Sequence, residues 1–167
     1  MRARCLPLIV ALASVTCDSS DGGRVGMRFA DTDPNLVAAR DSARASIAGL
    51  RRRLEAPPPS QSFISAKVPI HGNGTSEHFW LDSIRLEGDS IRGRLRTNGT
   101  DVQARAGDWV AVPVSELSDW MAIDSLGLCG GYSVRLMRNR LAPARRGMFD
   151  SGLAVLGLHE WRVREGC

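Results

Sequence analysis

Apolar residues change their spacing several times along the chain, and each change predicts a different element. Near the start, a mainly apolar stretch runs from Cys5 to Val15, directly behind Arg2 and Arg4. It is too short to span roughly 30 Å of hydrocarbon, which takes about 20 helical residues. This order of basic, apolar and small residues is typical of an export signal. We therefore expect residues 1–16 to be a removable signal peptide, with an uncleaved anchor as an alternative.

The residues that follow this stretch suggest a lipid anchor. Ser14-Val15-Thr16-Cys17 resembles the lipobox of bacterial lipoproteins, in which the cysteine becomes the first mature residue and carries the lipid. This predicts a membrane-anchored protein, lipidated at Cys17, that faces the periplasm or the cell exterior. Ala11-Leu12-Ala13 offers an ordinary cleavage site instead, and a soluble periplasmic or secreted protein would then result.

A tether and then a helix are predicted next. Residues 17–32 are rich in Ser, Asp and Gly, which is typical of a flexible linker. Asp33 suits a helix N-cap and Pro34 suits the first helical position. Apolar residues then share one helical face, namely Leu36, Ala43, Ile47, Leu50 and Leu54. Pro57-Pro58-Pro59 ends this helix just after a run of three cations, Arg51 to Arg53, which we expect to be solvated or to contact anionic lipid heads.

From Phe63 the apolar spacing changes to two, which indicates strands. Three strands over residues 63–70, 77–86 and 90–97 are separated by turns. In the second strand the pattern puts Trp80 and Ile84 on one face, and Phe79 and Leu81 on the other. A fourth strand ends at Val114, a fifth follows Gly131 through Arg138, a short helix lies within residues 142–157, and residues 160–164 form an edge strand.

These elements predict an α+β fold. An N-terminal amphipathic helix packs on a curled antiparallel β-sheet or a small open barrel. Residues 33–164 form a single domain, and the 43% hydrophobic content is ample for one core.

Charge argues against a nucleic-acid partner. The net charge of +4 includes two arginines of the signal peptide and falls to +2 without them. Acidic and basic residues alternate along the domain, as on a solvated surface. Lys67 is the only lysine, and such a bias towards arginine is typical of a GC-rich genome.

Six short motifs follow one another between residues 31 and 140. They are Asp33…Ala38-Ala39…Ala43, Phe63…Lys67-Val68, Glu77-His78-Phe79-Trp80-Leu81, Gly107-Asp108-Trp109-Val110, Leu117-Ser118-Asp119-Trp120-Met121 and Gly130-Gly131-Tyr132-Ser133-Val134-Arg135. In this order they resemble the YegJ-like family, bacterial proteins that share a domain of unknown function and of which many carry an export signal. The resemblance implies an α+β domain and brings no established activity, so no catalytic role is transferred.

Glu77, His78 and Asp82 bring a histidine and two carboxylates close together in the sequence. On a strand, His78 and Asp82 lie about 13 Å apart, too far to hold one metal ion. No nucleophile motif or phosphate-binding glycine loop is present. We expect no metal and no cofactor.

Aromatic residues suggest a binding surface. Trp80, Trp120 and Tyr132 could line a groove in which Arg135 grips an anion, although each ring could equally fill the core. Asp119 could cap backbone amides. The leading hypothesis is a non-enzymatic binding module for an envelope protein or a cell-wall partner. The candidate binding residues are Glu77, His78, Trp80, Asp119, Trp120, Tyr132 and Arg135. The alternatives are an enzyme that uses Glu77, His78 and Asp119 across adjacent strands, and a structural lipoprotein without a discrete site.

Four cysteines remain to be placed. Cys5 leaves with the signal peptide and Cys17 carries the lipid. Cys129 and Cys167 are then free to form a disulfide in an oxidising compartment, or to remain as two thiols.

Overall fold

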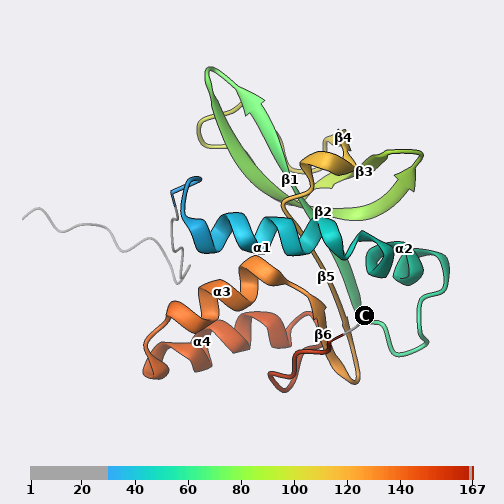
Figure 1. Cartoon of the computed structure of the whole chain (residues 1–167), viewed down its shortest axis with the longest axis vertical. Coiled ribbons are helices and arrows are strands. Elements are labelled where there is room, and N and C mark those ends of the chain that lie inside the picture. The colour runs from blue at the N-terminus through green and yellow to red at the C-terminus, as the bar shows by residue number, and fades with distance from the viewer. Residues whose placement is uncertain (1–29, 166) are drawn as a thin grey trace, which may run out of the picture.

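The computed structural model describes residues 30–165 and residue 167. The predicted signal peptide, Cys17 and nearly all of the predicted tether lie outside the described residues. Helices and strands both contribute to the described part, so the α+β class is confirmed (Figure 1).

Six antiparallel strands form one sheet, in the order β4-β3-β2-β1-β5-β6. Each of the strands β1 to β4 pairs with the next one along the chain, and β5 then pairs with the edge of β1 that β2 leaves free. The strands are β1 (Phe63–Gly72), β2 (Thr75–Glu87), β3 (Ser90–Leu95), β4 (Trp109–Pro113), β5 (Asp119–Asp124) and β6 (Gly127–Gly130). Because β4 and β6 lie at opposite edges, the sheet is not closed, and the predicted barrel alternative is wrong.

A bulge in β2 corrects the predicted faces of this strand. Its register against β3 shifts between Asp82 and Arg85, and Ser83 adopts a φ of 51°. The extra residue turns Ile84 to the same side as Phe79 and Leu81, where all three are buried in one core cluster. Sequence alternation placed Ile84 on the opposite face because a bulge breaks the period of two.

The predicted first helix is in fact two helices, α1 (Pro34–Ala45) and α2 (Ile47–Glu55). Asp33 caps α1 as expected, since its Oδ1 accepts from the amides of Asn35 and Leu36. Ser46 separates the helices. Its hydroxyl donates to the Ala43 carbonyl and accepts from Trp120 Nε1 at 2.9 Å, which fixes the break against β5.

The predicted fifth strand is also wrong. Residues 132–140 form helix α3 (Tyr132–Arg140), and a short 3₁₀ turn, η1 (Val114–Glu116), leads instead into β5 and β6. Helix α4 (Pro143–Ala154) occupies the region where a short helix was expected. Residues 160–164 form no strand, and only Val163 bridges to Leu128.

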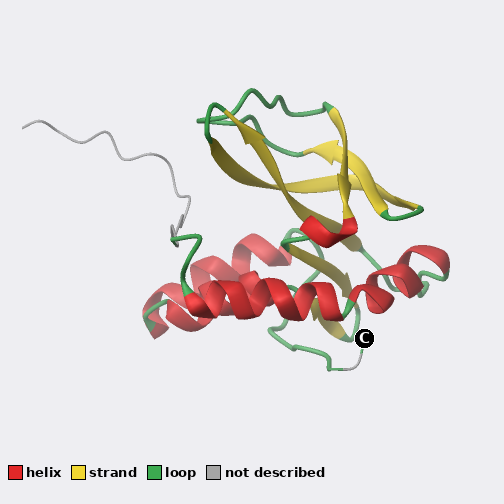
Figure 2. Cartoon of the chain, turned by 45° about the horizontal axis from the view of Figure 1, so that its top comes forward, coloured by secondary structure: helices red, strands yellow, loops and turns green. Residues whose placement is uncertain are grey.

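Two hydrophobic clusters hold the sheet between helices. Alternate residues of β5 point to opposite sides: Trp120 and Ala122 pack with Ala43 of α1 and Leu50 of α2. Met121 and Ile123 pack with residues of α3 and α4 on the other side, including Val134 and Leu153. Figure 2 shows the helices gathered around the β5 end of the sheet, while β2 to β4 extend away from them. The cavity described next lies where α1 passes close to both α3 and β5.

Candidate functional site

A polar cavity of about 140 Å³ opens between α1, α3 and the β1–β2 hairpin. Its walls carry two cations, a histidine, a carboxylate and two hydroxyls alongside two apolar side chains. These residues are Asp31, Leu36, Arg40, Lys67, His78, Ser118, Ser133 and Met137. At about 30 Å³ per water molecule, the space suits a group of a few heavy atoms.

Lys67 is the unusual member of this set. It extends from the face of β1 opposite to Ala66 and Val68, with its ammonium 5.8 Å from the centre of the Trp80 ring. Burial lowers the pKa of Lys67 below its usual value, and the charge of Asp119 only partly offsets this. Within the described residues, no carboxylate oxygen lies within 4.0 Å of its nitrogen, and no group hydrogen-bonds to it. A partly buried cation without an ion-pair partner is costly, and such arrangements are concentrated at functional sites.

His78 faces the same cavity in a defined tautomer. Its Nε2 lies 3.0 Å from an Arg40 nitrogen, which can only donate, so Nε2 accepts. Nδ1 therefore carries the proton and donates to the Ser118 hydroxyl at 2.7 Å. Burial, followed by the charges of Arg40 and Lys67, lowers the pKa of His78 to about 4, whereas Asp31 opposes the shift. His78 is consequently neutral at physiological pH.

This lowered pKa predicts a loss of stability in mild acid. The unfolded chain takes up a proton at this histidine near pH 6.5, whereas the folded protein does so near pH 4, so protonation favours unfolding as the pH falls through this window. After allowing for partial exposure, we expect the free energy of unfolding to fall by about 1–2 kcal/mol. Denaturant titrations at several pH values should show a smaller fall in His78→Gln and an unchanged fall in His159→Gln, since His159 is exposed. A His78→Gln profile identical to that of the wild type would contradict this assignment.

Asp119 lies behind the cavity wall, where it holds Ser133. It is fully buried at the start of β5, and burial raises its pKa. Its carboxylate accepts from the amides of Trp120, Tyr132 and Ser133 and from the Ser133 hydroxyl, at 2.6 to 3.0 Å. The capping role that the sequence predicts is thus confirmed, and the capped element is the N-terminus of α3. Asp119 positions Ser133 and does not itself line the cavity.

The three residues of the enzyme alternative do not converge. Glu77 points to the opposite side of β2 from His78, where its Oε2 accepts from the amides of Thr100, Asp101 and Val102. Asp119 is already engaged by four donors. The geometry therefore gives an enzyme built on Glu77, His78 and Asp119 no common reaction centre.

The predicted aromatic groove is divided by the sheet. Trp80 packs in the cluster on the α3–α4 side, whereas Trp120 is buried on the α1–α2 side. Trp120, Tyr132 and Arg135 do meet at a second cavity of about 430 Å³. There the Arg135 guanidinium lies 4.4 Å from the centre of the Tyr132 ring. Trp80 instead supports Lys67 in the first cavity.

Sequence reasoning missed Lys67, Arg40, Ser118 and Ser133 as site residues. One signal was available, since Lys67 is a charge within an otherwise apolar strand and the only lysine in the chain. In the described part of the chain, no group of three or more metal-binding side chains is suitably placed for an ion. The helices of that part are too short or too polar to cross a membrane.

Comparisons with known proteins give a family but no activity. A family model described as "Uncharacterized protein conserved in bacteria (DUF2314)" matches residues 33–156. A "Putative ankyrin repeat protein" of Neisseria meningitidis serogroup B is 31% identical over 98 residues. The match covers 56% of this chain and 39% of that relative, so the chain spans only about two fifths of its length. No solved structure matches the chain.

Proposed function

The chain belongs to the DUF2314 family of uncharacterised proteins conserved in bacteria, and we propose that it is a non-enzymatic binding module that holds an anionic group of its ligand beside Lys67. The observation that carries this proposal is the partly buried ammonium of Lys67, which faces a cavity and has no ion-pair partner among the described residues. An anion in the cavity would supply the missing partner.

The charges around the cavity favour an anionic ligand. Arg40 and Lys67 contribute two positive charges, and Asp31 contributes one negative charge. Asp31 already pairs with Arg40 at 2.6 Å, and this hydrogen bond lowers its pKa. Ser118 adds a hydroxyl that can donate to an oxyanion, because it accepts from His78 and its own proton makes only a 3.5 Å contact with the Glu116 carbonyl. The Ser133 hydroxyl is already donated to Asp119. A carboxylate or a phosphate group fits both the charge and the volume.

We further propose that this module works at the cell envelope, carried on a lipid at Cys17, where its partner is a protein or cell-wall component. The disulfide between Cys129 and Cys167 supports this location, because disulfides persist in oxidising compartments and are rare in the cytosol. In the native host, Cys17→Ser should move the protein from the membrane to the soluble fraction. Retention in the membrane would contradict lipid anchoring.

The single lysine makes the binding proposal directly testable. Brief acetylation followed by peptide mass spectrometry reports the reactivity of Lys67 without interference from other lysines. At constant ionic strength, inorganic phosphate or acetate should slow this acetylation saturably, with chloride as the reference anion. By NMR, the same anion should raise the pKa of His78 from about 4, because it offsets the nearby cations.

Matched variants separate the cavity from general charge. Arg40→Gln should weaken protection by about tenfold, since it removes one of the two cations. Arg51→Gln changes the net charge equally on an exposed part of α2 and should leave protection unchanged. If neither anion protects Lys67, the proposal fails, and a structural lipoprotein without a discrete site becomes the better description.

A further inference from the structure

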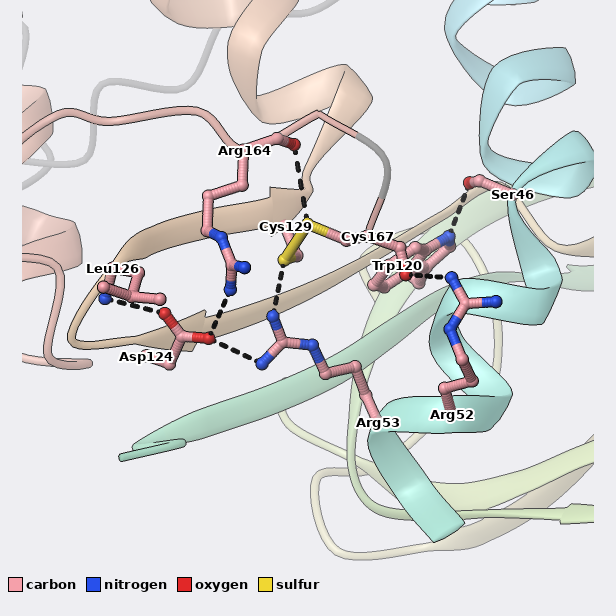
Figure 3. Close-up of a disulfide and its surroundings, with 9 residues drawn as sticks. All are labelled: Ser46, Arg52, Arg53, Trp120, Asp124, Leu126, Cys129, Arg164 and Cys167. Carbon is pink, nitrogen blue, oxygen red and sulfur yellow. Dashed lines mark hydrogen bonds and ion pairs between the residues drawn. A yellow bond between two sulfur atoms is a disulfide. The ribbon is translucent and has the colours of Figure 1, made fainter. Parts of the chain in front are cut away.

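The disulfide between Cys129 and Cys167 lies against a buried guanidinium (Figure 3). Arg53 of α2 is only 8% exposed, and its Nη2 donates to Cys129 Sγ at 2.8 Å. This contact places the positive charge of the guanidinium next to the sulfur atom of Cys129. A cation beside a sulfur stabilises the thiolate that forms when a disulfide is opened.

The surrounding charges do not cancel that of Arg53. Asp124 Oδ2 accepts from Arg53 at 2.6 Å and from Arg164 at 2.9 Å, so one carboxylate serves two guanidiniums. Figure 3 shows both arginines converging on this carboxylate beside the sulfur atoms. The cluster of three side chains keeps a net charge of +1 next to Cys129.

The two sulfur atoms differ in access. Cys129 belongs to β6 and is fully buried. Cys167 is partly exposed and lines the second cavity. Cys167 is therefore the more accessible of the two cysteines for an incoming thiolate, with Cys129 as the sulfur that leaves.

We propose that this bond is an exchangeable disulfide and that Cys167 is the site at which a small, carboxylate-bearing thiol is attached. The incoming thiolate attacks Cys167 Sγ and forms a new disulfide there. The bond between Cys129 and Cys167 breaks, and its electron pair leaves on Cys129 Sγ as a thiolate beside Arg53. One disulfide replaces another, so no further oxidant or reductant is consumed.

The second cavity argues for a carboxylate-bearing thiol. Three arginine side chains line it, Arg52, Arg135 and Arg164, against one side-chain carboxylate, that of Glu165. Arg52 donates to the Cys167 carbonyl, and Arg164 is engaged by Asp124. Arg135 stacks on Tyr132 and forms no ion pair within the described part of the chain, so its guanidinium remains available for a carboxylate on the thiol.

The experiment compares three thiols on the oxidised full chain: glutathione, which carries carboxylates, neutral 2-mercaptoethanol and cationic cysteamine. Iodoacetamide traps the released Cys129, and peptide mass spectrometry locates both adducts. At equal thiolate concentration, glutathione should react roughly tenfold faster than cysteamine, with its adduct on Cys167. Equal rates, an adduct on Cys129, or no adduct at all would overturn the proposal.

Variants test the two arginines separately. Arg53→Met combined with Asp124→Leu removes the guanidinium that contacts Cys129 Sγ, while Arg164 keeps the local net charge at +1. Loss of this contact should slow all three thiols by roughly tenfold. Arg51→Met, a neighbouring exposed arginine of α2, should change none of the rates. Arg135→Gln should reduce the preference for glutathione without affecting 2-mercaptoethanol. An unchanged rate in the double variant would overturn the role of Arg53.

Discussion

Replacing Asp119 with Ala should lower the free energy of unfolding by about 3–5 kcal/mol. The substitution removes the shared acceptor of three amides and one hydroxyl, all at the junction of β5 and α3. The site is fully buried, so water cannot readily replace the carboxylate, and each orphaned donor keeps its desolvation cost. Chemical denaturation followed by circular dichroism measures the loss.

A second readout locates the damage. Because two of the orphaned amides belong to Tyr132 and Ser133, hydrogen exchange should accelerate first at the N-terminus of α3. Asp41→Ala removes an exposed carboxylate of α1 and should change stability by no more than about 0.5 kcal/mol. If Asp119→Ala were as mild as Asp41→Ala, the carboxylate would not be the element that holds α3 in place.

This same carboxylate explains the largest error of the sequence prediction. Tyr132, Val134 and Leu136 alternate with polar residues, and this spacing of two indicates a strand. The helix forms because Gly131 takes a left-handed conformation and Asp119, distant in sequence, caps the next two amides. The residues next to Tyr132 in the sequence do not reveal this cap, because the capping carboxylate belongs to another part of the chain.

Strands were predictable where one face is buried and the turns are short. β3 follows its spacing of two closely, since its buried residues alternate with exposed arginines. β5 was not predicted, because it lies between β1 and β6 with helices on both sides. All six of its residues are buried, so it shows no alternation.

The cavity was harder to predict than the fold, because it depends on contacts between distant elements. The sequence singled out His78, yet its partners Arg40 and Ser118 come from α1 and from the residue before β5. Trp80 was expected in a groove with Trp120. In the sheet, Trp80 lies opposite Lys67 of β1, and Trp120 lies opposite Ala66, the residue before it. Because successive strand residues point to opposite faces, the register places the two rings on opposite sides of the sheet. Of the side chains that line the cavity, sequence reasoning singled out only His78, because their grouping is set by how α1 and α3 pack together.

Asp124→Leu should cost about 3–5 kcal/mol, because it leaves Arg53 charged and buried without its carboxylate. Burial alone would raise the pKa of Asp124, but hydrogen bonds from Arg53 and from the amide of Leu126 lower it, so the carboxylate is ionised at neutral pH. Arg53→Met combined with Asp124→Leu should recover at least half of the loss, since the buried charge is removed together with its partner.

The comparison requires a double-mutant cycle under non-reducing conditions, so that the disulfide stays intact in every variant. We expect a coupling energy of about 2 kcal/mol or more between Arg53 and Asp124. The exposed pair of Asp82 and Arg94, which are 2.9 Å apart, provides the matched cycle and should give less than about 1 kcal/mol. Equal coupling energies in the two cycles would mean that burial does not strengthen the Arg53–Asp124 interaction. The charge of Arg53 beside Cys129 would then be screened as well as a charge at the surface.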